Sequence, residues 1–353
     1  MMNSKIIGTG SYIPSQIKNN NTFLNHSFLD TEGNKIQSGN DEIINKFQSI
    51  TGIKERKYIT NDLTSSDIAK EASINAIKSS SIDPETIDYI ILAHNIGDVS
   101  KGSNQLDAMP SLASRVKSKL GIKNPNCVAY DILFGCPGWL EGLIQANAFI
   151  KSGIANRCLI IGSETLSRVI DSNDRDGMIF SDGAGAVIIE STNDSNGVLS
   201  HKTVTYTDND ETNYIYYGKS NNLKSDETKY IKMQGRKVYE FALSKVPNAM
   251  KKCFDECGCN IKNLKKIFIH QANQKMDDAI IKRFYKLYNC KPPKDILPMN
   301  IEEFGNSSTA TIPTLLDLVI KKNYNGHRIE KGDLVLFASV GAGMSINAVS
   351  YQF

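Results

Sequence analysis

The sequence lacks any long hydrophobic run. No stretch of its 353 residues approaches the ~18 consecutive apolar residues that a membrane-spanning helix needs. Residues 1–14 also lack the charged start and apolar centre of a secretory signal. We therefore expect no membrane span and a cytoplasmic location.

Neither sign of charge dominates. The 41 Lys and Arg residues nearly balance 38 Asp and Glu residues, for a formal net charge of +3. This excess is too small for a dedicated nucleic-acid binder, so we expect no nucleic-acid partner. A partner attracted by charge would have to contact a local patch.

Proline and cysteine are both too sparse for the chain classes that depend on them. With 10 Pro and 40% hydrophobic residues, the composition excludes a disordered or collagen-like chain. The seven cysteines are odd in number and scattered, which favours free thiols in a reducing compartment over a disulfide framework. The length suits two domains or one large α/β unit.

Short apolar runs alternate with helical patterns along the chain. The runs predict buried strands at 5–8, 89–92, 158–162, 186–189, 267–269 and 334–338. The helical patterns lie at 66–79, 109–120, 139–152, 238–253, 275–288 and 312–322. This alternation predicts an α/β sandwich with parallel sheets. We expect a covering loop at 95–109 and a surface excursion at 196–226.

The two halves of the chain resemble each other. Residues 87–92 have the same lead-in as residues 264–269, which lie 177 positions later. The same offset carries residues 160–162 onto residues 337–339. We therefore expect two similar halves with the functional site where they meet. The expected halves are 1–193 and 194–353.

Cys136 is the candidate nucleophile. It lies where an apolar strand runs into a glycine turn and then a helix that begins near Pro137. A thiol at a helix N-terminus is close to the positive end of the helix dipole, which favours the reactive thiolate. The alternative is a small buried hydrophobic residue, but the flanking glycines favour the nucleophile.

Two polar residues in the second half could act with this cysteine. His270 follows the predicted strand 267–269, at the sheet edge where α/β folds bind ligands, and can act as an acid, a base or a neutral donor. Asn306 precedes the predicted helix at 312–322. A structural histidine and a helix cap are the respective alternatives. The glycine-rich segment 339–344 could present a backbone amide to an oxyanion, although close packing would explain its glycines equally well.

Two other motifs fail as cofactor or metal sites. Gly8-Thr9-Gly10 lacks the third glycine of a dinucleotide fingerprint, and the sequence has no Gly-Lys-Ser/Thr phosphate loop. Cys253, Cys257 and Cys259 lack the paired spacing of a zinc site. We therefore expect neither a cofactor nor a metal.

Taken together, three motifs resemble the β-ketoacyl-acyl-carrier-protein synthase III family of the thiolase superfamily. They are the Cys136 turn, His270-Gln271-Ala272-Asn273 and Gly305-Asn306-Ser307. Residues 6–14, 51–56 and 181–186 are also similar to that family, so the resemblance runs from end to end. It implies a duplicated five-layered αβαβα fold, usually a homodimer. Elongating relatives use a second histidine where Asn306 stands, and degradative thiolases carry another cysteine in the last glycine loop, which is absent here.

The resemblance implies a role for each motif. Cys136 would accept an acyl group from a thioester, and His270 and Asn306 would stabilise the enolate formed when malonyl-carrier loses carbon dioxide. The backbone amides of Cys136 and Ala342 would form the oxyanion hole. The remaining implied positions, at the acyl pocket and dimer contact, are Met109, Gly341 and Gly343.

The resemblance also bears on the acyl donor. Members primed by coenzyme A carry a tryptophan and an arginine where Lys46 and Ile50 stand here, whereas Arg175 matches another nucleotide-contacting arginine. We therefore expect a carrier-bound or longer acyl donor in place of acetyl-CoA. These features and residues 134–139 resemble relatives in specialised lipid pathways, such as dialkylresorcinol formation, in which a ketosynthase joins two acyl chains.

A basic helical pattern follows His270, and we expect an acyl carrier protein to dock there because carrier proteins are acidic. The residues concerned are Lys275, Lys282, Arg283 and Lys286. The alternative is an ordinary solvated face interrupted by Asp277 and Asp278.

Two other classes of protein remain open. In papain-like cysteine proteases the histidine and asparagine also lie ~130–150 residues beyond the cysteine, and His270 lies 134 residues after Cys136. However, their cysteine stands near the mature N-terminus in a Cys-Gly-Ser/Ala context that Cys136 lacks. A non-catalytic scaffold with the thiolase fold is disfavoured by the intact cysteine, histidine and asparagine.

Overall fold

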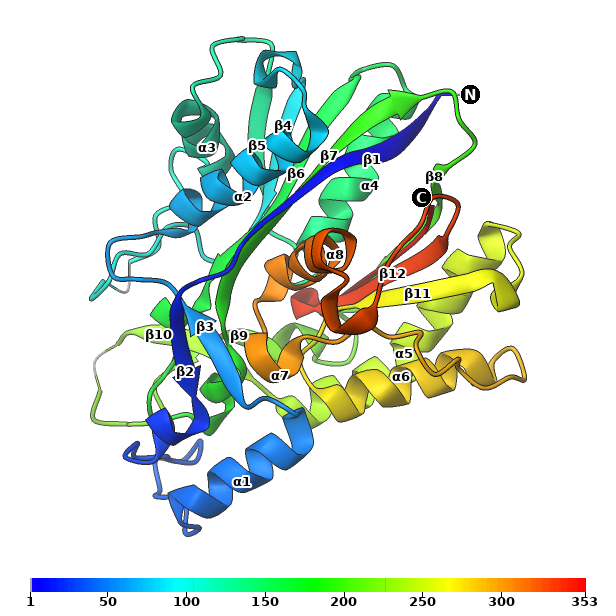
Figure 1. The fold of residues 1–353 in the computed structure, drawn as a ribbon. Helices are drawn as coiled ribbons and strands as arrows, with labels where there is room; N and C mark the ends of the chain where they lie inside the picture. The colour runs from blue at the N-terminus through cyan, green and yellow to red at the C-terminus, as the bar shows by residue number, and fades with distance from the viewer. Residues whose placement is uncertain (1, 104, 226) are drawn as a thin grey trace.

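Two β-sheets contain most of the strands, and each sheet has helices on both faces (Figure 1). The computed structural model describes residues 2–103, 105–225 and 227–353. The five-stranded sheet has the order β1 (Asn3–Tyr12), β7 (Asp182–Thr192), β6 (Arg157–Thr165), β4 (Tyr89–Ala93) and β5 (Val128–Ile132). The four-stranded sheet has the order β11 (Leu264–Ile269), β12 (Leu334–Gly341), β13 (Ser345–Gln352) and β8 (Gly197–Thr205).

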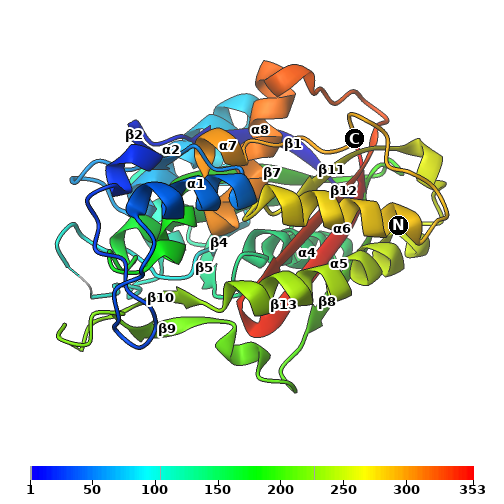
Figure 2. The ribbon, with the colours of Figure 1, turned by 90° about the horizontal axis from the view of Figure 1, so that it is seen from below.

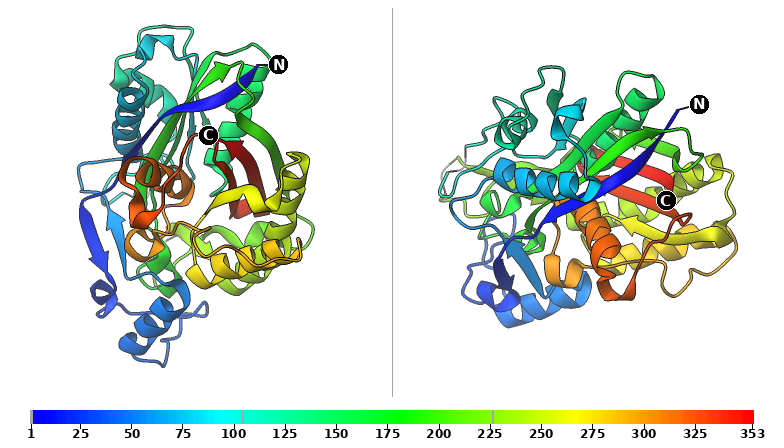
Figure 3. Two further views of the ribbon diagram at one scale, coloured as in Figure 1. Left: turned by 45° about the vertical axis from the view of Figure 1, so that its right-hand side comes forward. Right: turned by 45° about the horizontal axis from the view of Figure 1, so that its top comes forward.

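The helices form three layers that alternate with the two sheets. The outer face of the five-stranded sheet is covered by α2 (Ser65–Ser80) and α3 (Leu112–Leu120). The outer face of the other sheet is covered by α5 (Gly235–Glu256) and α6 (Gln274–Lys286), which lie side by side in Figure 2. Between the sheets lie α4 (Gly138–Lys151) and α8 (Thr311–Lys322), where Trp139, Leu315 and Phe337 share one buried cluster. The predicted αβαβα sandwich is therefore confirmed, and Figure 3 shows it from two further sides.

The prediction of parallel sheets is wrong in part, because both sheets are mixed. Strand β4 runs parallel to β5 and β6, and β11 runs parallel to β12. In contrast, β7 is antiparallel to β6 and β1, and β13 is antiparallel to β12 and β8. A parallel pair needs a crossover, usually a helix, whereas no α-helix of the described chain separates β6 from β7 or β12 from β13.

The two sheets also share a register that follows the internal repeat. Ile91 of β4 pairs with Ile160 of β6, and Phe268 of β11 pairs with Phe337 of β12. Both residues of the second pair lie 177 positions after those of the first pair. The expected division at 193/194 falls between the end of β7 at Thr192 and the start of β8 at Gly197, and it stays a prediction.

Several elements depart from the sequence predictions. Helix α1 (Asn40–Thr51) was not predicted, nor was the pair β2 (Gln16–Asn19) and β3 (Glu55–Tyr58). The segment 196–226 is not a simple surface excursion, because it contains β8 and β9 (Ile215–Lys219), which pairs with β10 (Lys229–Met233). Strand β8 carries polar residues on its exposed face, so its sequence is not a continuous apolar run and does not predict a strand. Residue 226 lies outside the described residues.

The expected loop at 95–109 is held by contacts near both of its ends. Asp98 and Asp107 form an isolated bridge, and the guanidinium of Arg115 on α3 contacts both of their carboxylates, at 2.9 and 2.6 Å. Residue 104 lies outside the described residues. The short helix α7 (Ile301–Phe304) precedes Asn306.

The motif Gly8-Thr9-Gly10 is explained by close packing of a strand against a helix. A Cβ atom at Gly10 would lie 2.2 Å from the backbone oxygen of Ala72 on α2, and one at Gly8 would lie 2.5 Å from that of Ala76. Glycine is therefore needed where β1 meets α2. Within the described ranges, we find no helix with the length and apolar character required to cross a membrane.

Candidate active site

Cys136 lies in the turn between β5 and α4. Gly135 has a φ of +64°, and a Cβ there would lie 2.8 Å from the backbone nitrogen of Ala342, so glycine is required. A Cβ at Gly341 would likewise lie 2.5 Å from the backbone nitrogen of Cys136. These close approaches bring the amides of Cys136 and Ala342 into neighbouring turns, as the expected oxyanion hole requires.

His270 directly follows β11, as predicted. Its backbone nitrogen donates to the carbonyl of Ala338 at 2.9 Å, and the side chain is buried. Burial lowers the pKa of the imidazole to about 4, although a hydrogen bond with the Ser308 backbone opposes the shift. The ring is therefore neutral near pH 7. The Nδ1 atom of His270 is buried and has no hydrogen-bond partner among the described residues. The imidazole ring can therefore form one more hydrogen bond than the protein supplies.

Asn306 lies between α7 and α8, and it is buried. Its side-chain oxygen accepts a hydrogen bond from the backbone nitrogen of Ser308 at 2.8 Å. It caps this local turn and does not cap α8, whose N-cap residue is Ala310. Because the oxygen is engaged by Ser308, the nitrogen of the carboxamide is the atom through which Asn306 can donate a further hydrogen bond.

The structure brings these three side chains to one pocket. This inner pocket has a volume of about 150 Å³ and is lined by Cys136, His270 and Asn306 together with Asn95, Ser308 and Ala342. Apolar side chains complete the wall, including those of Leu166, Phe180, Ile231 and Val340. The thiol of Cys136, the imidazole of His270 and the carboxamide of Asn306 therefore border the same cavity.

Ser308 contacts the nucleophile directly, and the sequence reasoning missed it. Its hydroxyl donates to the Cys136 sulfur at 3.3 Å. Its φ of +50° is unusual for a residue other than glycine. Such a conformation costs about 1–3 kcal/mol and is found most often where function fixes a side chain. The positive φ cannot be read from the sequence Gly305-Asn306-Ser307-Ser308.

The expectation of a resting thiolate at Cys136 is not met. Burial raises the pKa of the thiol to about 12, the hydrogen bond from Ser308 lowers it, and the nearby Glu164 carboxyl raises it. Moreover, Cys136 precedes the N-cap residue of α4, Pro137. Desolvation of this partly buried thiol therefore outweighs the helix dipole, and the sulfur is a thiol near pH 7.

Two further polar residues adjoin Ser308. Asn95 follows β4 and donates from Nδ2 to the Ser308 hydroxyl at 2.9 Å. The same nitrogen contacts the carboxylate of Glu164 on β6, which is fully buried. A polar residue after an apolar strand was visible at Asn95, but a lone Glu at the end of a strand gives no comparable signal.

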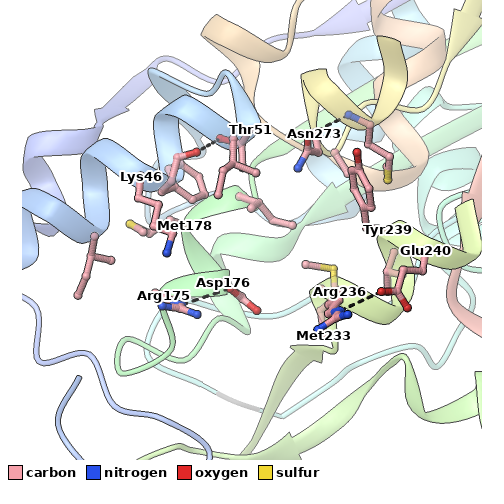
Figure 4. A pocket seen from close by; sticks show the side chains of 18 of the residues that line it. Lys46, Thr51, Arg175, Asp176, Met178, Met233, Arg236, Tyr239, Glu240 and Asn273 are labelled. Carbon is pink, nitrogen blue, oxygen red and sulfur yellow. Dashed lines mark hydrogen bonds and ion pairs between the residues drawn. The ribbon is translucent and has the colours of Figure 1, made fainter. Parts of the chain in front are cut away.

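A larger chamber adjoins the inner pocket, and Figure 4 shows side chains that line this chamber. This outer chamber has a volume of about 530 Å³ and is lined by residues of α1, α5 and α6 and of the segment 175–179. Both cavities are bordered by Met233, Val238, Ala272 and Met276. Three positions singled out from the sequence line the outer chamber together: Lys46, Ile50 and Arg175.

The predicted docking residues form one exposed face of α6. They are Lys275, Lys282, Arg283 and Lys286. Arg283 also donates to the carbonyl of Leu243 on α5 at 2.8 Å. The expected interruption by Asp277 is absent, because that side chain is fully buried and burial raises its pKa well above the usual value. Asp278 is exposed.

The predicted acyl-pocket residues lie at different places. Met109 projects from the surface, with 90% of its area exposed, and it does not line the inner pocket of this chain. Of the described residues in the glycine-rich loop, Val340 and Ala342 line the pocket. Gly341 instead supports the Cys136 turn, and Gly343 contacts Ser345. The described residues include no group of three or more His, Cys, Asp or Glu side chains placed to hold a metal ion.

Comparisons with known proteins give a consistent result. Sequence models of 3-oxoacyl-[acyl-carrier-protein (ACP)] synthase III and of its C-terminal part match residues 130–208 and 254–353. The chain is 34% identical over 352 residues to the β-ketoacyl-[acyl-carrier-protein] synthase III of Clostridium acetobutylicum, covering 98% of this chain and 97% of that protein. It is 32% identical over 351 residues to that of Vesicomyosocius okutanii, covering 99% of each.

A solved structure supports the same assignment. The 3-oxoacyl-[acyl-carrier-protein] synthase III from Aquifex aeolicus VF5 matches with a TM-score of 0.80 and 28% identity, covering 99% of this chain and 100% of that chain. The matches therefore extend over both sheets and the pocket between the two halves. The chain belongs to the β-ketoacyl-[acyl-carrier-protein] synthase III family.

Proposed function

We propose that this protein is a condensing enzyme that transfers an acyl group from a thioester to Cys136 and joins it to a malonyl-carrier with loss of carbon dioxide. The observation that carries this proposal is the convergence of Cys136, His270 and Asn306 on the inner pocket. Full-length similarity to synthase III proteins supports it and disfavours the papain-like protease and the non-catalytic scaffold.

In the first step, the Cys136 sulfur attacks the thioester carbonyl carbon. A new carbon–sulfur bond forms, the bond to the donor sulfur breaks, and the donor leaves as a thiol. The amides of Cys136 and Ala342 stabilise the negative charge that develops on the carbonyl oxygen. Covalent capture divides the condensation into two easier steps.

In the second step, the malonyl-carrier loses carbon dioxide and its thioester becomes an enolate. The amide nitrogen of Asn306 donates to the enolate oxygen, and the neutral imidazole of His270 does so in the tautomer that carries its single proton on the nitrogen facing the pocket. Because that oxygen gains charge only as carbon dioxide departs, these donors stabilise the transition state more than the bound substrate. The enolate carbon then attacks acyl-Cys136, releasing the β-ketoacyl-carrier and the free enzyme.

The outer chamber supports a particular kind of acyl donor. Its wall includes the apolar residues Ile43, Phe47 and Ile50, and Lys46 stands beside them. We expect a carrier-bound or longer acyl donor, with Arg175 near the mouth of the chamber contacting the phosphate-bearing end. The exposed basic face of α6 would dock the acidic carrier. Asn273 and Met276, at the start of α6, also line the chamber, which places this face beside the opening.

A homodimer is supported by a strand edge that pairs with no other strand in the part of the chain that the structure describes. Strand β5 is at the edge of the five-stranded sheet, and exposed apolar side chains lie along it or close by. Val128 is 45% exposed, Leu133 69% and Met109 90%. Exposed apolar groups beside an unpaired strand are typical of an interface. We place the enzyme in the cytoplasm, in keeping with its free cysteines.

Intact-mass spectrometry tests the proposal. Wild-type protein incubated with an acyl thioester should gain one acyl group, and Cys136→Ala should gain none. Adding malonyl-carrier should discharge the acyl group and release carbon dioxide. Equal acylation of Cys136→Ala, or peptide cleavage without carbon dioxide release, would overturn the proposal.

A further inference from the structure

The fully buried carboxyl group of Glu164 is separated from the Cys136 sulfur by the hydroxyl of Ser308. The Ser308 hydroxyl lies 3.3 Å from the Cys136 sulfur and within hydrogen-bonding reach of the Glu164 carboxyl group, and its single proton is donated to one of them at a time. Asn95 holds this arrangement, because its Nδ2 contacts both the Ser308 oxygen and a Glu164 oxygen. The positive φ of Ser308 aims its hydroxyl into this position. Sulfur, hydroxyl and carboxyl therefore form a connected path.

The surroundings of Glu164 are held by several elements. Its Oε1 accepts from the Thr309 hydroxyl at 3.3 Å, and its Oε2 accepts from the Asn95 backbone at 3.3 Å. The titratable groups that interact with it are His94, Cys136 and Tyr217. Burial raises the pKa of Glu164 to about 7, while His94 and these hydrogen bonds oppose the shift. The carboxyl group can therefore gain or lose a proton near neutral pH.

The proposed reaction requires such a group. Cys136 begins as a thiol, because burial raises its pKa, so its proton must leave during acylation. His270, with a pKa lowered to about 4, is a poor proton acceptor near pH 7. A carboxyl group whose pKa is close to the working pH is better matched to the task.

We propose that Glu164 holds the proton of Cys136 through Ser308 while the acyl-enzyme exists. During acylation the Ser308 hydroxyl turns its proton from the sulfur toward Glu164, the sulfur proton passes to the Ser308 oxygen as the Ser308 proton passes to Glu164, and the departing donor thiolate takes a proton from water. During condensation the Cys136 thiolate is expelled, and the same route returns the proton to it. Glu164 acts through Ser308 and is therefore a positioning residue. This inference rests on the proposed function.

Single-turnover acylation, followed by intact mass between about pH 5.5 and 9, tests the inference. The wild-type rate should rise about tenfold per pH unit at low pH and level off above about pH 7. Glu164→Gln should lose this rise and fall about 10²-fold at pH 8, the size of a typical acid–base contribution. Ser308→Ala should do the same, and the double variant should lose little more because both residues serve one path.

Two controls separate this role from a structural one. Thr309→Val removes another hydroxyl that donates to Glu164 but does not contact the sulfur, so the pH dependence should persist. His94→Asn should also retain the pH dependence of acylation. That result would assign the titrating group to Glu164 and exclude His94. Thermal melts show whether each variant is folded. If Glu164→Gln does not fold, the pH dependence of Ser308→Ala tests the proton-holding role.

The possible failures are distinguishable. A Glu164→Gln variant that is uniformly slower but keeps the wild-type pH dependence would overturn the proton-holding role and leave the proposed function standing. Loss of the pH dependence in His94→Asn alone would also overturn it. Wild-type protein that never acylates at Cys136 would overturn the proposed function and this inference together.

Discussion

The side-chain oxygen of Asn306 accepts a hydrogen bond from the backbone nitrogen of Ser308 at 2.8 Å. This contact joins the residue proposed to stabilise the enolate to the residue that donates to the Cys136 sulfur. It also fixes which end of the carboxamide is available to a substrate. In the proposed mechanism, the two steps therefore depend on neighbouring residues of one tight turn.

The orientation of Asn306 predicts a selective defect in Asn306→Asp. Aspartate keeps the oxygen that accepts from Ser308 but replaces the donor with a second, negatively charged oxygen. We expect decarboxylation of malonyl-carrier to fall about 10²–10³-fold, as when an oxyanion donor is removed. Acylation of Cys136, measured separately by intact mass, should change much less. Wild-type decarboxylation by Asn306→Asp would contradict the assigned donor.

The raised pKa of Cys136 predicts slow alkylation of this residue at neutral pH. Because the thiolate is the reacting form and the pKa is about 12, the rate should increase about tenfold per pH unit from pH 7 to 10 without a plateau. Peptide mapping after iodoacetamide treatment measures it, with the exposed Cys290 as an internal control. A plateau below about pH 8 that persists in Ser308→Ala would show that the helix dipole outweighs burial, whereas a plateau that Ser308→Ala removes would come from the route to Glu164.

The contact between β1 and α2 predicts a large effect of Gly10→Ala on stability. The new Cβ would lie 2.2 Å from the Ala72 oxygen, so the strand or helix must shift. We expect the free energy of unfolding to fall by about 1–3 kcal/mol, the range for overpacking. Urea denaturation checks it. Gly183→Ala on β7 is the matched control, because its nearest atoms would be 3.7 Å away, and a loss equal to that of Gly10→Ala would contradict the packing argument.

Much of the site could be predicted because its main residues border regular elements. Cys136 and His270 each follow an apolar strand, and the internal repeat brings the corresponding strand ends to one place. The repeat predicts two similar halves, and the pairing of β11 with β12 follows the same 177-residue offset as the pairing of β4 with β6. The αβαβα layering follows from the same pattern of strands and helices.

The missed parts depend on contacts between distant residues. Glu164 and Ser308 lie 144 positions apart in the sequence, and only folding makes them neighbours. The β9 and β10 hairpin is rich in Lys and Tyr, so it lacks a simple apolar pattern even though Tyr217 and Ile231 line the inner pocket. Helix α1 is different, because Ile43, Ile44 and Phe47 have helical spacing that could have revealed it.

The basic face of α6 predicts a defect that depends on the carrier protein. In Lys275→Glu/Lys282→Glu, two exposed positive charges on α6 become negative. We expect KM for malonyl-carrier to rise about three- to tenfold at low salt, because exposed charge pairs contribute about 0.2–1 kcal/mol each and are screened by salt. With a small malonyl thioester that lacks the carrier, KM and kcat should not change.

A matched charge reversal on another surface completes this test. Lys151→Glu at the end of α4 alters the net charge by the same amount per residue but lies outside the α6 face, so its KM for malonyl-carrier should remain at the wild-type value. The comparison is made at two salt concentrations, because a docking contact should weaken as salt rises, even in the wild type. An equal rise in KM for Lys151→Glu would point to overall charge, and no rise in the α6 variant would show that this face is an ordinary solvated surface.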